Sequence, residues 1–279
     1  MLRTRELMRS LAAVAVGVSA VSILSCRQPP QPEPWQPATV GEVREALFKE
    51  LQTVTLKNCT LKRYGNAFDG GYLMCANLAN GIESAYSYGI AGEDSWGCQV
   101  SRDFGVPIHQ YDCFSSAEPK CDGGQFFFHN ECVGPRAESI DDMPFDIIAS
   151  QIARNGDNRK RLIVKIDVEG AEWDSLMATP DAVLDRIVQI PMELHGTDEV
   201  KFVEVVRRLK RKFYLVNLHF NNYACRSDIA PFPAWAFQVL WVNKRVGVFD
   251  PDGPSPAPMS PLNARDRPES GDCQALPTP

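Results

Sequence analysis

The chain has 279 residues, with 29 Lys and Arg against 35 Asp and Glu, and a formal charge of −6 at pH 7. This balance gives no basic surface field, so the composition argues against nucleic acid as a partner. Of the 21 prolines, five lie in residues 27–38 and eight in residues 250–279. The segment between them, residues 40–249, has the composition and length of a single α/β domain.

The N-terminus, residues 1–26, has the pattern of an export signal. Three arginines precede an uncharged, mostly apolar stretch that ends at Cys26. Residues 23–26 resemble the lipobox of bacterial lipoproteins, in which the Cys carries the lipid; an ordinary signal peptide and an uncleaved anchor are the alternatives. Residues 27–39 form a Pro-rich linker that cannot build a core. We therefore expect the protein to be exported, or anchored to a membrane through its leader or a lipid.

Eight of the nine cysteines remain when Cys26 is set aside. An even number behind an export signal predicts disulfides formed in an oxidising compartment, and the sequence leaves their pairing open. The cysteines are not expected to bind a metal, because the sequence has no Cys-x2-Cys pair. Two carboxylates and two histidines at later strand ends (Asp167, Glu193, His195 and His219) could also bind a divalent cation, but no helical His pair or other ligand spacing favours a metal site. Residues 250–279 are expected to form a disordered tail, unless a disulfide of Cys273 holds it.

Strand-like and helix-like segments alternate through the domain. In chain order we expect a helix at 40–56, a turn-rich stretch at 59–75, strands at 84–90, 107–111, 125–133, 161–168, 187–194, 214–220 and 236–242, and helices at 95–104, 144–154, 171–177, 181–185 and 199–212. This alternation indicates a mostly parallel sheet between helices, and the last two strands predict an antiparallel hairpin. Ligands of such sheets bind beyond the carboxyl ends of the strands, where the strand order reverses.

The first strand of the alternation ends in a glycine-containing loop. Gly89 and Gly92 allow a ligand to approach the backbone, and the helix that follows Glu93 offers unpaired N–H groups. The next strand ends at Asp112, at the spacing where a carboxylate accepts the hydroxyls of a ribose. Glycine pairs also occur in ordinary turns, so the spacing to Asp112 is what favours a nucleotide loop.

The most specific pattern follows the strand at 161–168. Asp167 comes after a mostly apolar run, where a carboxylate without a partner would be costly. Glu169 and Glu172 follow within one strand-to-helix turn, and Glu172 is interpreted more simply as a charge that favours the start of the helix.

Further polar residues end the later strands. Glu193 and His195 end the strand at 187–194, and His219 ends the strand at 214–220. A carboxylate or a histidine at such a position can act as a general base. Both histidines are also open to interpretation as structural residues.

Residues 165–172, Lys-Ile-Asp-Val-Glu-Gly-Ala-Glu, resemble the signature of FkbM-type S-adenosylmethionine-dependent methyltransferases. Residues 139–143 and 191–195 resemble two further elements of that family. Residues 63–75 are similar to a subgroup related to methyltransferase-like protein 24. The resemblance covers about residues 58–245.

This resemblance implies a class I methyltransferase fold, a Rossmann-like, seven-stranded, mostly parallel sheet with an antiparallel C-terminal hairpin. It implies S-adenosylmethionine as cofactor, with its methionine portion against the loop of Gly89, Gly92 and Glu93 and its ribose on Asp112. The residues that would face the methyl group and the acceptor are Asp167, Glu169, Glu193 and His195.

Two functions remain open at this point. The first is O-methylation of a small-molecule or carbohydrate hydroxyl. The second is an exported, non-catalytic binding module on the same fold. The eight cysteines favour the second, because the methyl donor is made in the cytosol, and so does a loop poorer in glycine than the usual family loop.

Overall fold

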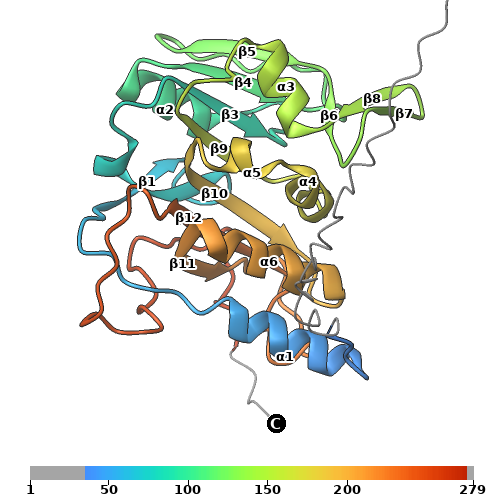
Figure 1. Cartoon of the computed structure of the whole chain (residues 1–279), viewed down its shortest axis with the longest axis vertical. Helices are drawn as coiled ribbons and strands as arrows, with labels where there is room; N and C mark the ends of the chain where they lie inside the picture. Colours follow the sequence, from blue (N-terminus) through green and yellow to red (C-terminus); the bar gives the residue numbers. More distant parts are fainter. Residues whose placement is uncertain (1–34, 275–279) are drawn as a thin grey trace, which may run out of the picture. The chain divides into compact units, whose positions relative to one another are not determined.

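The computed structural model describes residues 35–274, and the chain from residue 37 onward forms one compact unit. Its centre is a seven-stranded sheet in the order β11-β12-β10-β9-β3-β4-β5 (Figure 1). The strands are β3 (Ser84–Tyr88), β4 (Pro107–Tyr111), β5 (Gln125–His129), β9 (Leu162–Ile166), β10 (Ile187–His195), β11 (Phe213–Phe220) and β12 (Ala236–Asn243). Strand β12 is antiparallel to both neighbours, and β3, β4, β5, β9 and β10 pair in parallel. The expected Rossmann-like architecture is confirmed, with β12 inserted between β10 and β11.

Different elements cover the two faces of this sheet. One face packs against α1 (Val40–Glu50), α3 (Ile148–Arg154), α4 (Glu172–Ala178), α5 (Asp181–Leu184) and α6 (Val200–Lys212). The other face is covered by the hairpin of β1 (Leu61–Gly65) and β2 (Gly71–Cys75), the 3-10 turn η1 (Ala76–Ala79) and α2 (Ser95–Phe104). We call this second side the hairpin face.

Strand β9 shows how the sequence assigns side chains to these faces. Leu162, Val164 and Ile166 belong to the helix-covered core, whereas Ile163 packs with the hairpin cluster. Lys165 also lies on the hairpin face, with its Nζ 5.4 Å from the ring centroid of Tyr72. Because side chains alternate along a strand, this phase directs the residue after β9, Asp167, toward the hairpin face as well.

Four segments differ from the sequence expectation. The strand expected at 125–133 is divided into β5 in the central sheet and the short strand β6 (Cys132–Val133) in a separate three-stranded sheet. Helix α1 ends at Glu50, earlier than predicted, and the stretch predicted to be turn-rich at 59–75 contains the two paired strands of the β1–β2 hairpin. The helix predicted at 144–154 begins only at Ile148, because residues 143–146 form strand β8 (Met143–Asp146). This strand pairs with β7 (Glu138–Ile140) across a turn with positive φ at both central residues, and with the short strand β6 (Cys132–Val133).

All eight cysteines within residues 35–274 form disulfides, which link Cys59–Cys75, Cys98–Cys121, Cys113–Cys132 and Cys225–Cys273. Four disulfides indicate an oxidising, extracytoplasmic environment. Within residues 35–274, no helix combines the length and apolar character that crossing a membrane requires. The signal at 1–26 and the first part of the linker lie outside the described residues.

The Pro-rich segment 250–274, for which composition predicts disorder, is held against the domain. Its backbone N–H groups at Asp250 and Ala257 donate to the carbonyls of Thr55 and Thr53. Further along, Asp266 is buried, and Cys273 is joined to the loop after β11. Hydrogen bonds to residues 53–55 and one disulfide thus hold a segment whose composition does not form helices or strands.

Candidate functional site

The order of the sheet reverses between β3 and β9, and the loops after these two strands meet there. Gly89 follows β3 with a φ of +72°, and a Cβ added to it would lie 1.6 Å from the carbonyl oxygen of Asp167. The N–H of Asp167 in turn donates to the carbonyl of Tyr88 at 3.0 Å. A side chain at position 89 would collide with the carbonyl of Asp167, so this position requires glycine. The two contacts fix the start of the loop after β3 against the start of the loop after β9.

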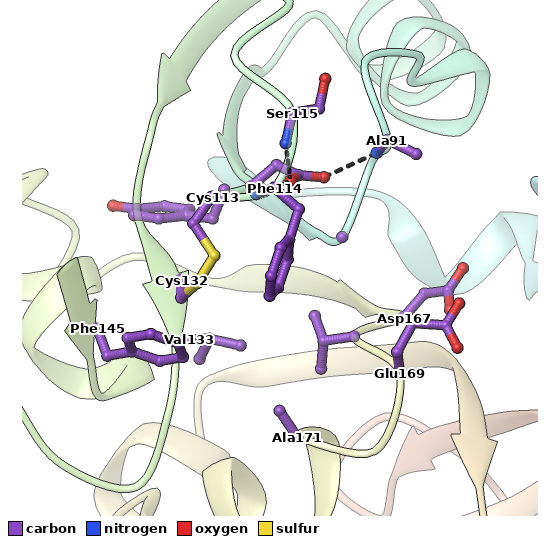
Figure 2. A pocket seen from close by; sticks show the side chains of 14 residues that line it. Ala91, Cys113, Phe114, Ser115, Cys132, Val133, Phe145, Asp167, Glu169 and Ala171 are labelled. Atoms are coloured by element: carbon purple, nitrogen blue, oxygen red, sulfur yellow. Dashed lines mark hydrogen bonds between the residues drawn. A yellow bond between two sulfur atoms is a disulfide. The ribbon is translucent and has the colours of Figure 1, made fainter. Parts of the chain in front are cut away.

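A cavity of about 410 Å³ opens beside these loops (Figure 2). Its wall is largely apolar and includes Phe114, Val133, Phe145 and the Cys113–Cys132 disulfide, and its opposite side carries Asp167 and Glu169. The volume falls in the range of small-molecule sites. Phe114 is 84% exposed although it lines the cavity, so a large apolar ring is available to a ligand.

Asp112 lies in this cavity, where its carboxylate joins two loops. Oδ2 accepts the N–H groups of Ile90 and Ala91 at 3.0 and 2.8 Å, and Oδ1 accepts those of Phe114 and Ser115 at 2.9 Å each. A carboxylate offers about four lone-pair sites, so all are used. A ribose hydroxyl that binds Asp112 has to displace one of these backbone donors.

The other predicted cofactor residues lie in different places. Gly89 lines the cavity, whereas Gly92 does not; a Cβ at Gly92 would lie 3.1 Å from Ser115 Oγ. Glu93 is exposed and lines a second cavity of about 230 Å³. The two cavities share Gly89, Ala91 and Asp167, so Asp167 can contact ligands in both.

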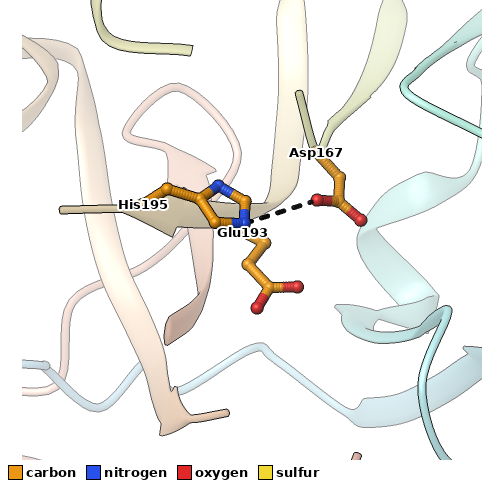
Figure 3. A group of neighbouring side chains, drawn as sticks. All are labelled: Asp167, Glu193 and His195. Atoms are coloured by element: carbon orange, nitrogen blue, oxygen red, sulfur yellow. Dashed lines mark ion pairs between the residues drawn. The ribbon is translucent and has the colours of Figure 1, made fainter. Parts of the chain in front are cut away.

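Three of the four predicted catalytic residues come together. Asp167, Glu193 and His195 each offer a ligand atom within 4.8 Å of those of the other two (Figure 3). The register between β9 and β10 pairs Ile166 with Met192, which brings the following residues side by side. Glu193 is 3% exposed and His195 is 7% exposed, so the cluster is buried at its β10 end and open only at Asp167.

Neighbouring side chains hold each member of the cluster. Tyr72 donates to Asp167 Oδ2 at 2.6 Å, and Asn221 donates through Nδ2 to Glu193 Oε1 at 2.6 Å. Lys165 Nζ lies 3.6 Å from Asp167 Oδ2 and donates to the carbonyls of Tyr88 and Gly89. These bonds fix the carboxylates before any ligand arrives.

His195 is oriented by Glu172, the first residue of α4. Glu172 Oε1 accepts the backbone N–H of His195 at 2.6 Å and lies 3.3 Å from its Nδ1. Glu172 is fully buried, and its other oxygen accepts the N–H of Gly170. The residue thus positions the histidine, in addition to lying in the acidic first turn of the helix.

The environment of the cluster changes its proton affinity. Burial, followed by the charge of Asp167, raises the pKa of Glu193 well above its ordinary value. Burial alone would lower the pKa of His195, but the hydrogen bond and charge of Glu172, with the charges of Glu193 and Asp167, raise it to about 9. Glu193 and His195 therefore keep their protons at pH values where the isolated side chains would lose them.

Glu169 lies at the rim of the site. Its side chain is 81% exposed, its Oε2 is 3.5 Å from His195 Nε2, and its backbone has a φ of +52°. The fourth predicted catalytic residue is thus adjacent to the cluster and reaches solvent.

His219 lies outside this cluster. Its Nε2 is 3.5 Å from Asp266 Oδ2, and neither of its ring nitrogens has a hydrogen-bond partner in the described part of the chain. It lines a separate cavity of about 350 Å³ with residues of the C-terminal segment.

Sequence reasoning missed four contributors to the site, which are Tyr72, Phe114, Glu172 in its contact with His195, and Asn221. The position of Phe114, two residues beyond a carboxylate at a strand end, was a usable signal for a cavity wall. Tyr72 and Asn221 contact Asp167 and Glu193, which are 95 and 28 positions away in the chain, and no local sequence pattern predicts such contacts.

Comparison of the chain with models of protein families, with curated proteins and with solved structures finds no match. The class of protein is therefore defined by fold and geometry. It is a Rossmann-like α/β protein with an apolar cavity and a buried carboxylate–histidine cluster at the reversal point of its sheet.

Proposed function

We propose that the protein is an S-adenosylmethionine-dependent methyltransferase that methylates a hydroxyl of a small molecule or carbohydrate. The observation that carries this proposal is the position of Asp167. It lines the 410 Å³ cavity and also belongs to the buried cluster with Glu193 and His195. One side chain thus connects a site of cofactor size to groups able to hold a proton.

The cavity fits such a cofactor in its chemistry. The aromatic and aliphatic wall of Phe114, Val133 and Phe145 suits the faces of a purine ring. The carboxylates of Asp167 and Glu169 on the opposite side favour a positively charged group. Asp112 fits a ribose less readily, because its acceptor positions are taken by backbone N–H groups.

When bound, S-adenosylmethionine would supply a methyl group on a sulfonium, and the electron pair of the broken sulfur–methyl bond would stay on sulfur. The chain must place the acceptor oxygen in line and remove its proton. Asp167 is the carboxylate that reaches the cavities, and Tyr72 fixes its orientation. Asp167, the member of the cluster that is open to the cavities, is placed to take the proton, and Glu193 and His195 lie buried behind it.

An exposed aromatic side chain supports a carbohydrate acceptor. The ring of Trp235 lies 5.6 Å from that of His195 and is partly exposed. A flat apolar surface beside hydrogen-bonding groups matches a sugar ring, which has an apolar face and polar edges. The loop before β12 therefore forms one side of the proposed acceptor site.

Calorimetry tests the cofactor directly. We expect the full chain, with its disulfides formed, to bind S-adenosylhomocysteine and S-adenosylmethionine. Asp167→Asn should retain binding of the demethylated product but lose transfer of labelled methyl groups to a cell-envelope extract. Asp174→Asn, an exposed carboxylate on α4, is the matched control and should retain both. Absence of binding at millimolar ligand would overturn the proposal.

The second candidate is an exported binding module without catalysis. It is favoured by the four disulfides, which indicate a compartment remote from the synthesis of the methyl donor, and by the occupied acceptor positions of Asp112. A module of this kind binds a nucleotide or glycan in the same cavity. For such a module, neither the wild type nor Asp167→Asn should transfer labelled methyl groups.

A further inference from the structure

The cluster of Asp167, Glu193 and His195 has a property that proton transfer does not require. Two donor atoms on one ion lie at most about twice the bond length apart, which is about 4.2 Å for bonds of about 2.1 Å. The three ligand atoms already lie within 4.8 Å of one another. Three donor atoms spread evenly around one ion with bonds of about 2.1 Å lie about 3.5 Å apart, so closure by about 1.3 Å would bring all three onto a single cation.

In each of the three side chains, a neighbouring residue contacts one of the two polar atoms, and the other polar atom accepts no hydrogen bond from residues 35–274. Asp167 Oδ2 is held by Tyr72, whereas Oδ1 is 4.0 Å from His195 Nε2. Glu193 Oε1 is held by Asn221, and its Oε2 accepts no hydrogen bond from any residue between 35 and 274. Only 3% of Glu193 is exposed, and Oε2 is the oxygen of its carboxylate that remains open to a further ligand.

The histidine shows the same arrangement. Its Nδ1 faces Glu172, while Nε2 has no hydrogen bond within the described residues and has carboxylate oxygens at 3.5 and 4.0 Å. Histidines that bind metals commonly donate their other ring N–H to a carboxylate, which sets the tautomer and the direction of the free nitrogen. Figure 3 shows the ring of His195 turned toward Asp167, with Glu193 beside it.

We propose that Asp167, Glu193 and His195 bind a divalent cation, Mn²⁺ or Zn²⁺, through Asp167 Oδ1, Glu193 Oε2 and His195 Nε2. Two carboxylates and one imidazole suit cations that accept both oxygen and nitrogen ligands. Three protein ligands leave coordination positions open for a substrate oxygen or water. Asp167 is the exposed member of the cluster, so these positions face the cavities.

The sequence places these side chains at strand ends but does not favour a metal site there, because Asp167 lies 26 and 28 residues before Glu193 and His195 and the three follow no metal-binding spacing. The cation site itself rests only on the geometry of the three side chains. Its role in holding an acceptor hydroxyl oxygen beside the methyl donor rests on the proposed function.

Titration of Mn²⁺ into the metal-free full chain, followed by the electron paramagnetic resonance signal of free Mn²⁺, tests the site without donor or acceptor. We expect one equivalent to bind, and we expect Glu193→Gln and His195→Gln each to weaken binding at least tenfold. Zn²⁺ should displace the bound Mn²⁺. His219→Gln is the matched control, because it removes another buried histidine beside a carboxylate, and it should leave the affinity unchanged.

A measurement on the wild type keeps the test valid if a variant fails to fold. Pulsed electron paramagnetic resonance of the bound Mn²⁺ should show coupling to one imidazole nitrogen. No binding at 1 mM Mn²⁺, binding without imidazole coupling, or affinity lost in His219→Gln but kept in Glu193→Gln would each overturn the cation site. Cofactor binding is measured separately by calorimetry, so failure of the cation site and failure of the proposed methyltransferase are distinguishable.

Discussion

The phenol of Tyr72 donates a 2.6 Å hydrogen bond to Oδ2 of Asp167. This bond connects the β1–β2 hairpin to the loop after β9, two segments separated by 95 positions in the chain. Tyr72 is buried and Asp167 is partly exposed, so the hairpin supplies a fixed donor to the one carboxylate that reaches both cavities. The hairpin is therefore part of the site as well as a cover for the sheet.

Replacement of Tyr72 with Phe tests this relationship. A hydrogen bond to a charged group contributes about 2 kcal/mol, so Tyr72→Phe should lower the free energy of unfolding by about that amount. Loss of the orientation of Asp167 should also reduce the rate of methyl transfer with little change in cofactor affinity. Tyr64→Phe is the control, because Tyr64 lies opposite Tyr72 in the hairpin and its hydroxyl makes no hydrogen bond within residues 35–274. Equal effects of the two substitutions would contradict the prediction.

Gly89→Ala should destabilise the fold severely. The new Cβ would overlap the carbonyl of Asp167 at 1.6 Å, and the φ of +72° disfavours any side chain. Gly105, the C-cap of α2, has a similar φ of +69° but nothing within 4 Å of its Cβ position. Gly105→Ala therefore measures the conformational cost alone, about 1–2 kcal/mol. Denaturant unfolding should show a loss at least twice as large for Gly89→Ala; similar losses would show that the contact with Asp167 relaxes easily.

Phe114→Ala should weaken ligand binding without weakening the fold. The ring is 84% exposed, so its removal should change the free energy of unfolding by less than about 0.5 kcal/mol. Loss of an aromatic stacking contact costs about 1–1.5 kcal/mol, which is about a tenfold rise in the Kd for S-adenosylhomocysteine. Phe68→Ala removes another exposed ring that lines neither cavity, and it should leave the Kd unchanged. An unchanged Kd in Phe114→Ala would place the ligand elsewhere.

The position of the site was predictable from local patterns, but its contacts were not. The mostly apolar run of β9 and the carboxylate after it locate Asp167 at a strand end on the basis of sequence alone. The ribose role expected for Asp112 assumed a free carboxylate. The structure instead fills its acceptor positions, because Ala91, at a φ of +47°, and its neighbours point their N–H groups inward. A loop conformation of this kind depends on packing that no short motif encodes.

The C-terminal segment shows a second limit of composition. Eight prolines in residues 250–279 rule out regular helices and strands, which suggested disorder. The structure nevertheless buries Asp266 against Gln238 of β12, whose Nε2 donates to it at 3.1 Å, and Asn222 accepts the N–H of Arg267. Absence of secondary structure and absence of order are separate properties, and only the first is set by local proline content.

The last prediction concerns the dependence of stability on pH. Burial lowers the pKa of His109 to about 4, and the nearby charge of Asp157 only partly offsets this effect. In the unfolded chain a histidine titrates near pH 6.5, so below that pH the unfolded state takes up a proton that the folded state refuses. The contribution of His109 to stability is therefore complete above about pH 6.5 and is lost as the pH falls toward 4.

This loss should reach about 2 kcal/mol by pH 5. His109→Phe removes the titrating group and keeps an aromatic ring in the stack between Tyr86 and Phe127, whose centroids are 5.0 and 5.3 Å away. We expect the free energy of unfolding of the wild type to fall more steeply between pH 7.5 and 5 than that of His109→Phe. Titrating groups that do not contact His109, including His195 with its opposite shift, are common to both proteins and cancel in the difference. Parallel curves would show that His109 is protonated in the folded state at pH 5, and the burial argument for this residue would then be wrong.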